Sequence, residues 1–132
     1  MGYAFSLEEP HDGVRTPCAF SNDQMQYVRL VMIEAGATAG GGFEAALPRP
    51  GLEPCADTVP IARFRSNGGW HVTAREAAFV ATRLRRAVEL DVVDDLLMFL
   101  DDSPDGALVQ EWVEEFAAFN EHAAERDGYY VA

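Results

Sequence analysis

The spacing of apolar residues along the chain predicts three main helices. The first, from Asp23 to Ala35, is apolar on nearly all sides, which is typical of a helix at the centre of a core. The second runs from about residue 74 to Leu90, and its apolar stripe consists of Ala77, Val80, Ala81, Leu84 and Val88. The third runs from about 104 to 126, and its stripe consists of Leu108, Trp112, Val113, Phe116, Phe119 and Ala123.

Helix-starting residues support these positions. Ser21 with Gln24, and Thr73 with Glu76, have the spacing of capping boxes, in which a side chain and a backbone N–H satisfy each other at the helix start. Ser103 followed by Pro104 predicts the start of the third helix. Residues 91–100 fit a shorter acidic amphipathic helix between the second and the third.

Short strands complete the predicted elements. Residues 3–7 alternate in polarity, and residues 129–131 could add a terminal strand. Residues 61–73 predict a β-hairpin, because two short apolar runs flank Ser-Asn-Gly-Gly, and Asn-Gly favours tight hairpin turns. We therefore expect an α+β fold that is mostly helical, with three or four helices packed around residues 23–35 and one β-hairpin beside them.

A long irregular connection separates the first helix from the predicted hairpin. Residues 36–60 contain five glycines and four prolines and are longer than most connections in compact domains. They predict either a linker or a functional loop, and we favour a loop packed on the surface of a single domain that covers residues 1–132. This length is typical of one domain with one core.

Charge is unevenly distributed. The formal net charge is −12, and all ten basic residues are Arg. Residues 61–86 carry six Arg and one acid, whereas residues 87–132 carry one Arg and thirteen acids. Three interpretations follow: the basic middle pairs with the acidic end, the Arg residues bind an anion, or the acidic surface binds a basic partner. Direct nucleic-acid binding is disfavoured because the overall field repels phosphates.

The absence of Lys excludes several chemistries. The chain cannot supply a P-loop lysine, a kinase lysine or a Schiff base. A Lys-free chain rich in Ala, Gly and Arg also indicates a GC-rich, bacterial coding sequence. No secretory signal and no membrane-spanning apolar run is visible, so we expect a cytoplasmic chain whose Cys18 and Cys55 are free thiols.

Metal, cofactor and nucleophile motifs are incomplete. Residues 101–106 resemble the start of an EF-hand loop, but Trp112 stands where the bidentate Glu is needed. The Cys and His residues lack zinc-ligand spacing, and Gly-x-Ser-x-Gly is absent. We therefore predict no metal, no cofactor and no catalytic residue.

The segment around the predicted hairpin is the most distinctive one. Arg65, Trp70 and His71 could present donors and an aromatic face to a planar or anionic ligand, or the aromatic residues could only pin the hairpin to the helices. The pattern Phe-x-Ser-Asn-x-Gly-Trp-x-Val-Thr, a helix, Glu-Phe-x-x-Phe and a Gly-Tyr-Tyr ending resembles small acidic proteins of actinobacteria and their phages. The resemblance covers about residues 61–131 and implies neither an activity nor a site.

Together these features predict a small acidic non-catalytic protein-interaction or regulatory module. Its partner would be a protein with a basic surface, contacted by acids of residues 91–126, namely Asp94, Asp95, Glu111, Glu114 and Glu115. Self-association is also open, since an exposed Phe79 could seal a homodimer. The alternative is a ligand-binding or enzymatic domain with a pocket beside the 61–73 hairpin.

Overall fold

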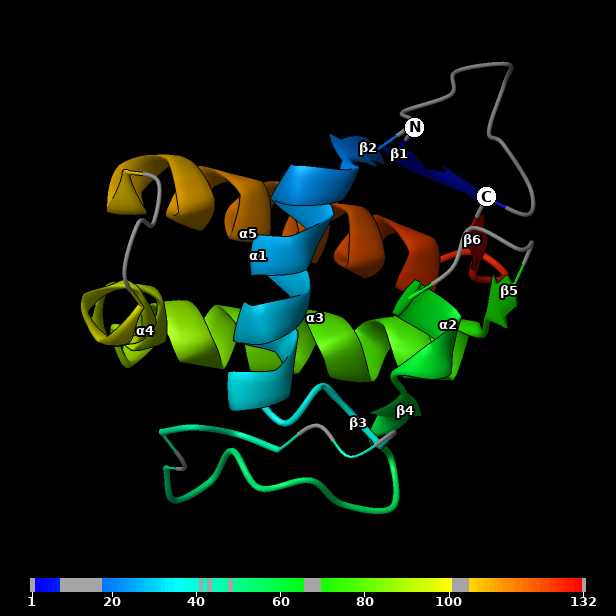
Figure 1. Ribbon diagram of the computed structural model, residues 1–132. Coiled ribbons are helices and arrows are strands. Elements are labelled where there is room, and N and C mark those ends of the chain that lie inside the picture. The colour runs from blue at the N-terminus through cyan, green and yellow to red at the C-terminus, as the bar shows by residue number, and fades with distance from the viewer. Residues whose placement is uncertain are drawn as a thin grey trace.

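The computed structural model describes residues 2–7, 18–40, 42, 44–47, 49–65, 70–100 and 105–131. Within these residues it contains five helices and six short strands (Figure 1). The three longer helices are α1 (Asn22–Glu34), α3 (Ala74–Glu89) and α5 (Gly106–Ala124), and the two short ones are α2 (Ala62–Arg65) and α4 (Val92–Phe99). The predicted α+β, mostly helical fold class is therefore confirmed.

The helices form a packed layer in which α3 lies alongside α5 and α1 crosses both (Figure 1). Both predicted capping boxes are present, at Ser21–Gln24 and at Thr73–Glu76. The buried side of α1 carries five apolar residues and Glu34, as expected for a central helix. α5 begins two residues later than predicted, because Asp105 caps it by accepting a hydrogen bond from the Ala107 N–H. The predicted cap at Ser103 lies outside the described residues.

A four-stranded antiparallel sheet packs against one end of this layer. Its order is β2 (Cys18–Ser21), β1 (Gly2–Leu7), β6 (Tyr129–Val131) and β5 (Trp70–Val72). The inner face meets α5 through an aromatic cluster centred on Phe5, whose ring lies 4.8 Å from Phe116 and 5.9 Å from Tyr129. Inside the core the Tyr129 hydroxyl donates to Asn120, so burial of this polar group is compensated.

The prediction of a β-hairpin over residues 61–73 is wrong. Residues 62–65 form helix α2 rather than a strand, and β5 pairs with β6 instead of with the preceding residues. Phe64 on α2 is fully buried and its ring meets Phe116 edge-on. A helical turn points Phe64 into the core, whereas Trp70–Val72 gain their hydrogen bonds from the chain's last strand. The turn residues 66–69 lie outside the described residues.

The described residues of the 36–60 connection make several contacts with the helices. A short parallel pair, β3 (Thr38–Ala39) with β4 (Val59–Pro60), closes its base, and Leu52 is buried. The Thr58 hydroxyl donates to the Gly36 carbonyl, and Arg83 of α3 donates to the carbonyls of Ala35 and Glu53. These hydrogen bonds attach the connection to the end of α1 and to the middle of α3.

Gly36 is required where this connection leaves α1. Its φ is +69°, and a Cβ there would overlap the Leu52 carbonyl oxygen and lie 2.6 Å from the Arg83 guanidinium. We expect Gly36→Ala to lower the free energy of unfolding by about 2 kcal/mol or more, because backbone strain and overlap add. Gly51→Ala is the matched control: its φ is +86° but no atom lies within 4 Å, so only the strain of about 1 kcal/mol remains. Urea unfolding of both variants measures the difference, and equal losses would contradict the close-approach argument.

Candidate functional site

A buried carboxylate fixes the middle of the 36–60 connection. Glu34, at the last position of α1, is only 4% exposed. Its two carboxylate oxygens accept hydrogen bonds from the backbone N–H groups of Ala46 and Leu47, each at 2.7 Å. Charge-assisted hydrogen bonds of this kind offset the cost of burying a carboxylate. Glu34 therefore holds Leu47 at a defined place beside α1.

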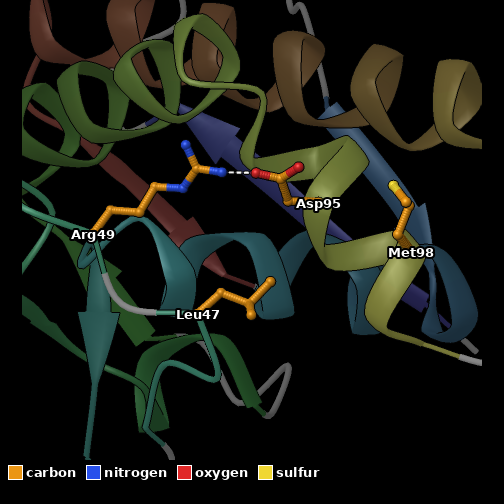
Figure 2. Close-up of a pocket in the computed structure, with 4 residues that line it drawn as sticks. All are labelled: Leu47, Arg49, Asp95 and Met98. Atoms are coloured by element: carbon orange, nitrogen blue, oxygen red, sulfur yellow. Dashed lines mark ion pairs between the residues drawn. The ribbon is translucent and has the colours of Figure 1, made fainter.

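Arg49, two residues further along, joins the connection to α4. Its guanidinium forms an ion pair with Asp95 and donates a hydrogen bond to the Leu90 carbonyl. Figure 2 shows Arg49 reaching toward Asp95, with Met98 one turn further along the same helix. These residues and Leu47 line a shallow, open hollow of about 380 Å³. The hollow thus combines an ion pair with two apolar side chains.

The outward face of α4 carries both acids and large apolar residues. The inward positions Val92, Val93, Leu96 and Leu97 are buried. On the other side, Asp94 and Asp95 occupy the first turn, and Met98 and Phe99 follow one turn later. Met98 is 87% exposed and Phe99 60% exposed, more than any other large apolar residues in the described part of the chain. We call Asp94, Asp95, Met98 and Phe99 the α4 face.

A second acidic surface follows α5. Its outward side carries the carboxylates of Glu111, Glu114, Glu115, Glu121 and Glu125, which we call the α5 row. Glu121 forms an ion pair with Arg85 at 2.7 Å, and this hydrogen bond lowers the pKa of Glu121. Among the described residues no salt bridge reaches the other four carboxylates. Glu114 is half-buried and lies close enough to Arg85 for their charges to attract, so within the described residues Glu111, Glu115 and Glu125 carry the charge that no salt bridge balances.

The arginines of the basic middle segment are used within the fold. The ion pairs are Arg63–Glu76, Arg75–Asp57, Arg85–Glu121 and Arg86–Glu89, with N–O distances of 2.7–3.1 Å. Two of these acids, Glu89 and Glu121, belong to residues 87–132, as the charge-compensation interpretation expected. Arg83 instead donates to backbone carbonyls and lies over the Phe79 ring, 4.9 Å from its centre. Phe79 is half-buried and not exposed as expected, whereas self-association itself stays a prediction.

The three residues predicted to bind a ligand lie around the edge strand β5. Arg65 is exposed at the end of α2, Trp70 is 45% exposed, and His71 is half-buried against Tyr130, with ring centres 4.9 Å apart. Alternation along a strand directs Trp70 and His71 to opposite faces of the sheet. His71 is further held by the Asp127 carbonyl, 3.2 Å from its Nε2. Trp70 and His71 therefore do not line one common pocket, although they are neighbours in the sequence.

The five predicted partner-binding acids separate into two groups. Asp94 and Asp95 belong to the α4 face, and Asp95 already pairs with Arg49. Glu111, Glu114 and Glu115 belong to the α5 row. Leu108, predicted to be in the core, is exposed, because Val109 occupies the inward position instead.

The sequence analysis missed Leu47, Arg49, Met98 and Phe99. A helical period over residues 92–99 was available as a signal, since it puts residues 98 and 99 on the side of residues 94 and 95. No local pattern, by contrast, could place Leu47 and Arg49 against α4.

No protein-family model, no curated protein and no solved structure matches this chain. Among the described helices, none combines the length and the apolar character needed to span a membrane. The described residues also contain no group of three or more His, Cys, Asp or Glu side chains placed to hold a metal ion. The EF-hand-like residues 101–104 lie outside the described part.

We expect Glu34→Gln to lower the free energy of unfolding by about 1–3 kcal/mol, because an amide offers one acceptor to two backbone N–H groups. Glu44→Gln, at an exposed position of the same connection, is the control and should change stability by less than about 0.5 kcal/mol. Urea unfolding checks both variants. Equal stabilities would mean that Glu34 does not anchor residues 46 and 47.

The two free cysteines differ in reactivity. Cys18 is buried, and this burial, together with the nearby Glu115 charge, raises its pKa to about 12. Cys55 is exposed. At about pH 8 a thiol reagent should therefore label Cys55 in the folded protein and reach Cys18 only after unfolding, because the thiolate is the reactive form. Cys55→Ser should abolish the fast labelling, and fast labelling that persists in this variant would contradict the assignment.

Proposed function

We propose that this protein is a small acidic, non-catalytic interaction or regulatory module of the cytoplasm that binds a protein with a basic surface. The proposal rests on one observation: most arginines of residues 61–86 interact with other groups of the fold, whereas most glutamates on the outer side of α5 form no salt bridge within the part of the chain that the structure describes. Four of the six arginines in the middle segment form ion pairs, and Arg83 holds backbone carbonyls, whereas Glu111, Glu114 and Glu115 meet no salt-bridge partner in the described residues.

The α5 row lies on a rigid support. α5 packs along α3 and against the sheet through fully buried side chains such as Val113 and Phe116. Carboxylates fixed on such a surface create a negative potential that speeds and orients the approach of a basic partner. Salt should weaken this attraction, because exposed charges are screened beyond about 8 Å at physiological ionic strength.

The alternative of a ligand pocket beside β5 gains less support. Trp70 and His71 are directed to opposite faces of the strand, and the His71 ring is occupied by Tyr130 and the Asp127 carbonyl. Trp70 and His71 line neither the hollow beside α4 nor the hollow between α3, α5 and the 36–60 connection. The opposite directions of these two side chains favour docking of a protein over capture of a small ligand beside β5.

The test is affinity capture from a lysate of the source cells with the wild-type chain and with the triple variant Glu111→Gln, Glu114→Gln, Glu115→Gln. We expect the variant to lose most of the captured basic protein, because it removes three charges of the α5 row that form no salt bridge within the described residues, while helix propensity is kept. Quantitative mass spectrometry of the eluates measures the loss.

The control removes three exposed charges elsewhere, as Glu44→Gln, Glu53→Gln, Asp127→Asn. Both triple variants have the same net charge, so a difference between them reports on position rather than on total charge. Equal capture by both variants and the wild type, or a captured set without basic proteins, would overturn the proposed function.

A further inference from the structure

We propose that the α4 face is the docking point for an amphipathic basic segment of the partner, which places an apolar side chain on Met98 and Phe99 and its Lys or Arg residues beside Asp94 and the end of α4. This inference rests on the proposed function and deepens it, because it assigns the place of contact and the chemistry of the contacting segment.

Two large apolar side chains, Met98 and Phe99, are exposed on the short helix α4. Residues 92, 93, 96 and 97 point inward and are buried, so Met98 and Phe99 contribute little to the core. Met98 also lines the open hollow together with Leu47. Large apolar side chains clustered at a surface and edged by polar groups are typical of protein contact sites, and the flexible Met side chain adapts to the shape of an incoming group.

Negative charge lies next to this apolar pair on α4. Asp94 and Asp95 precede Met98 and Phe99 by one turn, so each acid lies on the same side of α4 as an apolar residue. The last turn of α4 carries no basic residue, and the C-terminal end of a helix carries the negative end of the helix dipole. A cationic side chain is therefore complementary both to the start and to the end of the α4 face.

The same charges decide between possible occupants. A second copy of this chain would bring an equally acidic α4 face and a net charge of −12, so the two copies would repel each other. Anionic lipid surfaces and nucleic acids would be repelled for the same reason. A basic protein segment with an apolar anchor satisfies both features of the α4 face, since the apolar contact supplies affinity and the charges set orientation.

Arg49 fixes the 36–60 connection next to the α4 face through its ion pair with Asp95. Because Arg49 neutralises Asp95, the unpaired charge on the α4 face is concentrated at Asp94, whose carboxylate lies beside Gly106 at the start of α5. The ion pair also holds Leu47 and Met98 on the two sides of the hollow (Figure 2). We therefore expect the incoming apolar group to settle between the connection and α4, with its cationic neighbours toward Asp94.

The test uses the purified full chain with methyl-labelled Met and a synthetic helical peptide that carries Leu on one face and Lys on the other. Met25 and Met32 are fully buried, so they serve as internal references for Met98. We expect the peptide to shift the Met98 methyl NMR signal, assigned with Met98→Leu, and to leave the signals of Met25 and Met32 in place. Control peptides in which every Leu is Gln, or every Lys is Glu, should produce no shift.

Variants locate the contact by fluorescence anisotropy of the labelled peptide. Met98→Gln with Phe99→Gln should weaken binding by about tenfold or more, as expected when apolar anchors are lost. Tyr130→Gln removes another exposed apolar side chain, on β6, and should leave binding unchanged. Asp94→Asn should weaken binding more than Glu125→Gln, because Glu125 lies beyond the far end of α5, about 28 Å from Gly106 and several screening lengths away.

The outcomes separate this inference from the proposed function. If the triple Gln variant of the α5 row loses its captured partner but the peptide does not shift Met98, the proposed function holds and the α4 face is not the docking point. Weakening by Tyr130→Gln equal to that of the Met98, Phe99 variant would also overturn the inference. Thermal unfolding of each variant, compared with the wild type, separates loss of binding from loss of fold; Met98, Phe99, Asp94 and Glu125 are exposed, whereas Glu114 is half-buried and Tyr130 contacts the His71 ring.

Discussion

The Glu34 carboxylate determines where the long 36–60 connection meets the helices. A negative charge in the last turn of α1 is unfavourable, because the helix dipole already places negative charge there. Two short hydrogen bonds from the backbone of residues 46 and 47 outweigh this cost and fix the connection. Arg49 then lies within reach of Asp95, and Leu47 lies opposite Met98. The hollow beside α4 therefore depends on one buried acid in another helix.

The charge pattern of the surface follows from how the fold uses its arginines. Arg83 holds the carbonyls of Ala35 and Glu53 at the base of the connection, and Arg85 joins α3 to α5 through Glu121. Arginine suits these tasks because its planar group donates several hydrogen bonds at once. Arg85 neutralises Glu121 and attracts Glu114, so the negative potential of the α5 row comes mainly from Glu111, Glu115 and Glu125. The same sequence segments thus provide both internal cross-links and an acidic exterior.

Features that depend on neighbouring residues, such as helix starts and buried helix faces, could be predicted from the sequence. The capping boxes at Ser21 and Thr73 set two helix starts, and the 3.6-residue period gave the buried side of α3. The hairpin prediction failed because tertiary contacts decided that segment: Phe64 gains a place in the aromatic cluster only if residues 62–65 are helical, and β5 finds its partner in residues 129–131. Arg49 and Asp95 are 46 positions apart, so their contact could not be read from spacing.

The α4 face shows how a short helix can combine affinity with selection of its partner. Apolar contact alone accepts many partners, because it has little direction, whereas acids alone give weak and salt-sensitive attraction. On α4 the acids and the apolar residues are one turn apart. A segment that packs against Met98 and Phe99 therefore also has to place a cationic side chain near Asp94. A partner with acids at the matching place is penalised by like-charge repulsion, which separates correct from incorrect segments. Because Asp95 is paired with Arg49, an apolar group that enters the hollow does not have to desolvate an unpaired carboxylate. The charge that selects the partner is therefore Asp94, which lies beside the apolar contact.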